Sequence, residues 1–191
     1  MSLSAPVIRN PKIRTIGWAF FVAVSLGVLA YPSSLRALDL GLTPSHVYSL
    51  WTNINDSLVA SSRVVSGDTA LRAKISEMKL GNFSGKNPGD VLNHVALYRE
   101  KLNRLLRAKN LPVVKRVAFD GGVVTPSDVY LNSGHVLNAQ IRWLIVGTGQ
   151  EQTVSQFYAR HGFSGKTPSD VFALVELANR RIDLLLNAAR L

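Results

Sequence analysis

A short motif, Thr-Pro-Ser-Asp-Val with close variants, occurs four times in this chain and constrains its fold more than any other feature. The copies read TPSHVY from residue 43, NPGDVL from 87, TPSDVY from 125 and TPSDVF from 167. Each copy has the composition of a helix start, because Thr or Asn can cap the first turn and proline fits the first helical position. An acid three residues after the cap can complete a capping box and suits the positive end of the helix dipole.

The motif thereby assigns structural roles to a set of residues at the helix starts. The predicted caps and their box partners are Thr43, Asn87, Asp90, Thr125, Asp128, Thr167 and Asp170. In the first copy, His46 stands in place of the acid, which predicts a weaker cap for that helix. The slot two residues further on holds Tyr48, Leu92, Tyr130 and Phe172. Packing of each helix start against its neighbour explains this slot better than ligand binding.

An apolar stripe at helical spacing follows each copy of the motif. The four stripes are Val47, Leu50, Ile54 and Leu58 with Trp51 alongside; Val91, Val95, Tyr98, Leu102, Leu105 and Leu106; Val129, Val136, Leu137, Ile141, Leu144 and Ile145; and Val171, Val175, Ala178, Ile182, Leu185 and Leu186. Steps of three and four residues predict helices of about 20 residues, each with one buried face. Shorter helices are predicted at 68–80 and 151–161.

The two halves of the chain resemble each other. Residues 43–111 align with 125–191 across a two-residue gap, and FSGK occurs in both, from residue 83 and from residue 163. We infer an internal duplication and an all-α fold: a bundle of four long helices with pseudo-twofold symmetry and short connecting helices. Two separate hairpins would leave much of each stripe in water. The first repeat pair spans 41–111 and the second 125–191, within one domain, and 112–124 is a linker with one short extended piece.

The first 35 residues differ from the rest of the chain. Arg9, Lys12 and Arg14 precede an uncharged run from Thr15 to Tyr31, which is typical of a signal anchor or signal peptide with a cytoplasmic N-terminus. The predicted membrane segment includes Trp18, Phe20, Phe21, Val22, Val24, Leu26, Val28 and Leu29. Two alternatives remain open: cleavage after Ala30, and a buried core helix.

The stretch FSGKTPSD from residue 163 resembles the end of a nucleotide-binding loop, G-x-x-x-x-G-K-[ST], but the resemblance fails in detail. Arg160 stands where the first glycine belongs, and the twin stretch from residue 83 has Asn87 in place of the hydroxyl that would hold Mg²⁺. The stretch is therefore interpreted as a loop and a cap. Lys86 and Lys166 remain as candidate contacts for an anion or an acidic partner beside a helix start.

No residue pattern for catalysis or metal binding stands out. The chain has no Cys, its four His residues lack metal-ligand spacing, and no nucleophile elbow occurs. The net charge is +10, and the densest basic stretch, 99–116, lacks the interleaved aromatics of nucleic-acid-binding segments. We expect no cofactor, no metal, no catalytic residues and no nucleic-acid partner.

These observations favour a non-enzymatic protein of a bacterial cell envelope. We expect an inner-membrane protein with most of its chain in the periplasm, or a cleaved and soluble periplasmic one, that acts as an adaptor, scaffold or accessory subunit for other envelope or membrane proteins. The alternative is a periplasmic bundle that senses or carries a small anionic or apolar ligand, in a pocket lined by Trp51, Tyr48, Tyr130 and Trp143. An envelope enzyme is the third alternative.

Overall fold

Four long helices begin at the four prolines of the recurring motif in the computed structural model, which describes residues 40–65, 69–117, 122–149 and 154–191. They are α1 (Pro44–Val65), α3 (Pro88–Ala108), α4 (Pro126–Thr148) and α5 (Pro168–Ala188). Between them lie a short helix, α2 (Thr69–Glu77), and a single 3₁₀ turn, η1 (Ser155–Tyr158). The described residues contain no strand, so the all-α prediction is confirmed.

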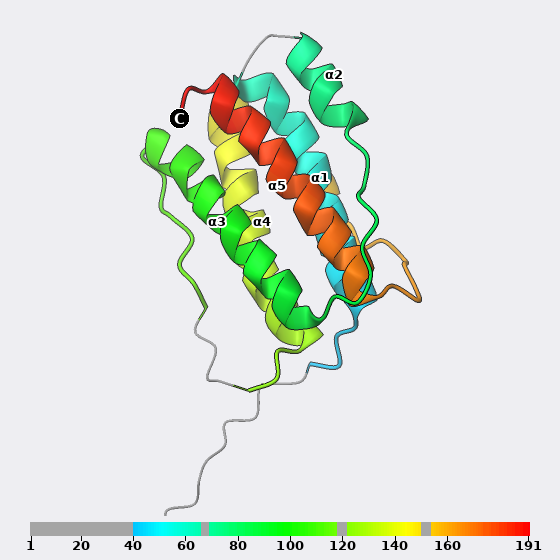
Figure 1. Ribbon diagram of the computed structural model, residues 1–191. Coiled ribbons are helices and arrows are strands. Elements are labelled where there is room, and N and C mark those ends of the chain that lie inside the picture. The colour runs from blue at the N-terminus through cyan, green and yellow to red at the C-terminus, as the bar shows by residue number, and fades with distance from the viewer. Residues whose placement is uncertain (1–39, 66–68, 118–121, 150–153) are drawn as a thin grey trace, which may run out of the picture. The chain divides into compact units, whose positions relative to one another are not determined.

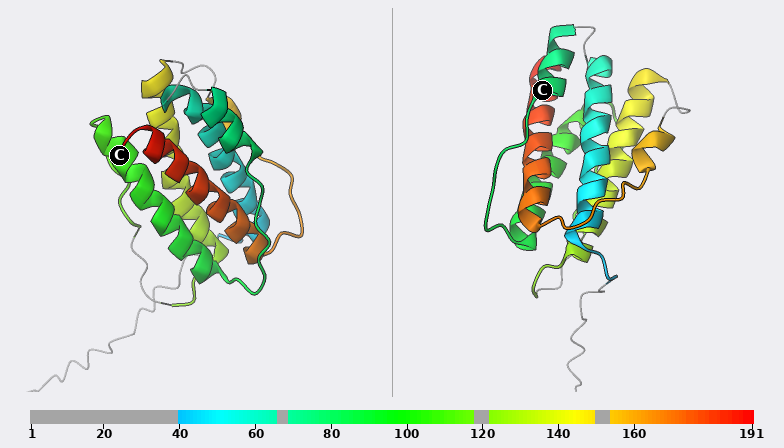
Figure 2. Two further views of the ribbon diagram at one scale, coloured as in Figure 1. Left: turned by 45° about the horizontal axis from the view of Figure 1, so that its top comes forward. Right: turned by 90° about the vertical axis from the view of Figure 1, so that its right-hand side faces the viewer.

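All four long helices run in the same direction (Figures 1 and 2). Their first turns meet at one end, where the prolines and the valines three residues later surround a central space of only about 10 Å³. These eight residues are Pro44, Val47, Pro88, Val91, Pro126, Val129, Pro168 and Val171. We call this the N-terminal end of the bundle. Because the helices are parallel, each connection must return along the outside of the bundle.

The helices form a ring in which α1 and α3 each pack between α4 and α5. The two long helices of each half of the chain therefore lie diagonally opposite each other, as the ribbon also shows (Figure 2). Helix α2 covers α1 and touches α5, and η1 lies against α1. The helical-bundle prediction is confirmed, and the duplication behind it remains a prediction.

The predicted apolar stripes lie in the core. All their members are buried except Ile145, which is partly buried at its edge. The core also contains polar side chains that the apolar pattern does not include. Trp51 Nε1–H donates to Ser133 Oγ at 2.9 Å, Tyr98 O–H donates to Gln140 Oε1 at 3.1 Å, and Gln140 Nε2–H donates to Ser61 Oγ at 2.9 Å. These bonds link α1, α3 and α4 inside the bundle.

Some predictions fall outside this description. The proposed membrane segment at 15–31 lies outside the described residues, and so does part of the linker, 118–121. Within the described residues, no helix is both long enough and apolar enough to span a bilayer. The described part of the linker contains no strand.

Candidate functional site

Three of the four helix starts carry a complete capping box. Asn87 and Asp90 exchange side-chain and backbone hydrogen bonds, as do Thr125 with Asp128 and Thr167 with Asp170. The Asp170 carboxylate accepts from the Thr167 N–H and hydroxyl, both at 2.8 Å, and these bonds lower its pKa.

The first helix start is built differently. His46 Nδ1 accepts the Thr43 N–H at 3.1 Å and lies 2.9 Å from Thr43 Oγ1, so the imidazole occupies the acceptor position of the carboxylate. The His46 N–H bonds the Thr43 carbonyl. An acceptor is thus kept at this start without the negative charge that favours a helix N-terminus.

Lys86 and Lys166 lie in the loops that precede α3 and α5, in closely similar settings. The Lys86 N–H donates to Ser169 Oγ and the Lys166 N–H donates to Ser45 Oγ, both at 3.1 Å. Each ammonium lies over an aromatic ring: Lys86 Nζ is 4.6 Å from the Phe172 centroid, and Lys166 Nζ is 4.5 Å from that of Tyr48.

The phenylalanine three residues before each lysine packs edge-on against the same ring. The Phe83–Phe172 and Phe163–Tyr48 centroid distances are both 4.9 Å. The loop before α3 therefore docks on the start of α5, and the loop before α5 docks on the start of α1, each through a phenylalanine, a backbone N–H and a lysine stem. The two lysines stabilise loop docking, and the structure does not bring them together into one site.

A groove beside α1 has the geometry of a small-molecule site. Helices α1 and α4 and the segment 158–163 enclose about 430 Å³, which lies within the usual range for ligand pockets. Hydrogen bonds hold the segment in place: the His161 N–H donates to Ser49 Oγ at 2.9 Å, and Asn53 Nδ2–H donates to the Ala159 carbonyl at 2.8 Å. We call this cavity the α1 groove.

Only one residue of the predicted pocket lines the α1 groove. Tyr130 does so, whereas Trp51 and Trp143 are buried in the core and Tyr48 is covered by Phe163 and Lys166. Sequence reasoning did not assign Ser45, Ser49 or Arg160 to a site. Their shared position depends on a segment that docks more than a hundred residues away along the chain, for which the local sequence contains no signal.

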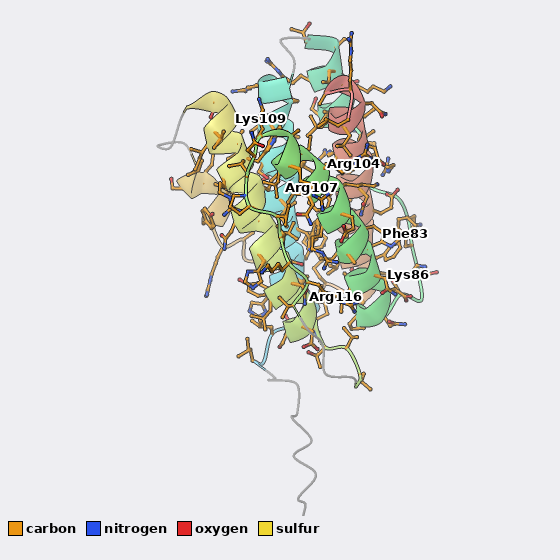
Figure 3. The ribbon with its side chains drawn as sticks, turned by 90° about the vertical axis from the view of Figure 1, so that its left-hand side faces the viewer. Phe83, Lys86, Arg104, Arg107, Lys109 and Arg116 are labelled. Carbon is orange, nitrogen blue, oxygen red and sulfur yellow. The ribbon has the colours of Figure 1, made fainter. Side chains whose placement is uncertain are left out.

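A second feature is a basic surface formed by α3, the segment after it and α4. It contains Arg104, Arg107, Lys109, Lys115, Arg116 and Arg142, all exposed. Figure 3 shows Arg104, Arg107, Lys109 and Arg116 on this side of the bundle. None of the six forms an ion pair with another described residue, although Arg142 donates to the Pro112 carbonyl at 3.1 Å. We call these six residues the basic face.

The histidines do not come together as a metal site. No group of three or more His, Asp or Glu side chains with metal-binding geometry occurs in the described part of the chain. His94 lies against the Phe172 ring, and burial lowers its pKa. His161 Nε2 lies 2.8 Å from Asn53 Oδ1.

No protein-family model matches the chain, and no curated protein or solved structure matches it.

Proposed function

We propose that this protein is a non-enzymatic adaptor of a bacterial cell envelope, built by internal duplication and held at the inner membrane by residues 15–31. Its bundle would lie in the periplasm and bind an acidic surface of a partner protein through the basic face. The N-terminal sequence, with its basic flank and uncharged run, supports the location. The absence of catalytic sequence motifs supports a binding role.

The observation that carries the proposal is the basic face itself. Within residues 99–117 the chain has seven basic residues and one acid, Glu100, which pairs with Arg99 at 3.2 Å. Lys101 pairs with Asp183 at 2.8 Å, which leaves the remaining cations of the segment facing solvent. An excess of exposed cations attracts an acidic surface over a distance of about 10 Å at moderate salt.

The basic face combines charged residues with a cavity and apolar surface, a combination that suits a protein partner. Lys115, Arg116 and Arg142 line a cavity of about 400 Å³ whose other walls include Val113 and Val114. Val113 is 39% exposed, so apolar contact area lies among the charges. Interfaces of this kind combine an apolar centre with charged groups that select the partner.

The interior also favours a binding surface over an internal ligand chamber. The side chains of all four stripes fill the core, and the space among the first turns is only about 10 Å³. A bundle with a filled interior offers its surface to partners.

The test is crosslinking and co-purification of the full-length chain from native membranes, with intact mass to show whether residues 1–30 are retained. A charge-reversed variant, Arg104→Glu with Arg107→Glu and Arg116→Glu, should lose the partner. A matched control changes the same amount of charge elsewhere, at Arg63, Lys74 and Lys79, and should keep it. Equal retention by both variants would contradict the proposal.

A further inference from the structure

The α1 groove has polar groups that can mostly donate hydrogen bonds and few that can accept them. Ser45 Oγ accepts the Lys166 N–H at 3.1 Å, and Ser49 Oγ accepts the His161 N–H at 2.9 Å. A hydroxyl that accepts still has its own hydrogen to donate. Neither hydroxyl donates to another described residue.

The histidine at the groove edge has the same character. Because His46 Nδ1 accepts the Thr43 N–H, the hydrogen of the neutral ring lies on Nε2, which is a donor. Tyr130 adds a half-buried hydroxyl and Arg160 an exposed guanidinium, and neither bonds to another described residue. Four side-chain O–H and N–H groups of the groove therefore donate to no other described residue, and one residue, Arg160, adds a full positive charge. These groups are available to a ligand.

Acceptors around the groove are largely occupied or absent. Asn53 Oδ1 already faces His161 Nε2 at 2.8 Å, and because Asn53 Nδ2 donates to Ala159 O, this ring nitrogen is the donor. Apart from the hydroxyl oxygens, which can accept as well as donate, His161 Nδ1 is the one side-chain acceptor left among the lining residues, and only while the ring is neutral. No lining residue is an Asp or Glu. A ligand that supplies oxygens and negative charge complements such a wall, as carboxylates do.

The rest of the wall is apolar. Leu42, Leu137 and Phe163 line the groove together with Leu50. From this combination we propose that the α1 groove is a binding site for a small organic carboxylate, whose charged end contacts Arg160, Tyr130 and the two serines and whose apolar part covers the leucines. The site is independent of the proposed adaptor function, because the basic face lies on other residues.

The test uses a matched pair of probes, 3-(trifluoromethyl)benzoate and its neutral amide, titrated into the full-length chain and followed by ¹⁹F NMR. We expect the carboxylate to bind about tenfold more tightly than the amide, as charge-assisted hydrogen bonds require. Arg160→Gln should remove most of that difference. Tyr130→Phe should weaken carboxylate binding a few-fold, on the order of one lost hydrogen bond.

Two further variants locate the site. Gly162 lines the groove with open space where a side chain would begin, so Gly162→Phe should block both probes. Arg63→Gln removes the same charge from an exposed position outside the groove and the basic face, and should leave binding unchanged. Equal affinity for the two probes would overturn the proposal, and so would an equal loss in Arg63→Gln and Arg160→Gln, which would indicate diffuse attraction. If Gly162→Phe fails to fold, Arg160→Gln at its exposed position still decides.

Discussion

The N-terminal end of the bundle and its middle differ in whether the four helices contribute the same side chains to the core. At the N-terminal end, each helix contributes the same two apolar residues, a proline and a valine, around one small space. In the middle the helices contribute different side chains, including Trp51, Tyr98 and Gln140. Residues that are alike cannot distinguish one neighbour from another, whereas a tryptophan and a serine that bond each other can.

The comparison assigns separate tasks to the two regions. The N-terminal end starts and aligns the helices, and the buried hydrogen bonds of the middle specify which helix lies beside which. A buried polar group costs little while it is paired and much when its partner is lost, so mispaired arrangements are disfavoured. Variants in each region test whether the two tasks are separate.

The largest effect is expected in the middle, from Trp51→Ala. The indole is fully buried, packs edge-on against Tyr98 at 5.3 Å and bonds Ser133. Its removal should lower the free energy of unfolding by about 3–5 kcal/mol, measured by urea denaturation at 25 °C. Trp51→Phe should lower the free energy of unfolding clearly less. A loss under about 1 kcal/mol for the alanine variant would contradict the claim that side chains in the middle of the bundle specify which helices are neighbours.

Gln140→Leu should have the next largest effect. It leaves the Tyr98 hydroxyl without its partner and removes the bond that Ser61 Oγ accepts, although Ser61 still donates to the Ser57 carbonyl, at a cost of about 1–3 kcal/mol. The double variant Gln140→Leu with Tyr98→Phe should recover part of this loss, because the tyrosine hydroxyl is then absent. If the losses of stability in the two single variants simply add in the double variant, the Tyr98–Gln140 hydrogen bond does not help to select neighbouring helices.

At the N-terminal end, Asp170→Asn should cost about 1 kcal/mol at neutral pH, because it removes the negative charge of the capping-box partner from the helix N-terminus. The pKa of Asp170 is lower in the folded state than in the unfolded chain, because Thr167 donates to the carboxylate. Its stabilising effect is therefore present above about pH 4 and lost as the pH falls through the folded-state pKa. The variant's stability curve should approach that of the parent as the pH falls through the folded-state pKa of Asp170, and parallel curves would refute this account.

The smallest effect is a gain, from His46→Asp. This substitution completes the fourth capping box and adds the charge that suits the helix dipole. Stability should rise by about 0.5 kcal/mol, seen as a higher denaturation midpoint at unchanged slope. No gain would mean that the imidazole bond to Thr43 already replaces the carboxylate fully.

The sequence predicted the features that depend on neighbouring residues. Helix starts follow from the motif, and buried faces follow from apolar periodicity, because both act within a few turns. The burial of Ser133 and Gln140 was not predicted, because a polar residue does not belong to an apolar stripe. Their burial depends on partners far along the chain.

The common direction of the helices and the α1 groove were also beyond sequence reasoning. Nothing local to a helix specifies whether its neighbour runs up or down. The groove requires His161 to reach Ser49, 112 residues away. Lys86 and Lys166 could be identified as exceptional from the sequence, but their aromatic partners could not.

The parallel arrangement of the helices also determines when the chain can become compact, because the core is complete only after the last helix is in place. Helical proteins usually fold fast because neighbouring contacts are close in sequence. Here α5 must pack against α1, where Asn55 reaches the Leu174 carbonyl across 119 residues. We expect a growing chain to keep its apolar stripes exposed until the last helix leaves the ribosome, and refolding to be slow for an all-helical protein. Stopped-flow refolding would test this, and a sub-millisecond phase with full amplitude would exclude it.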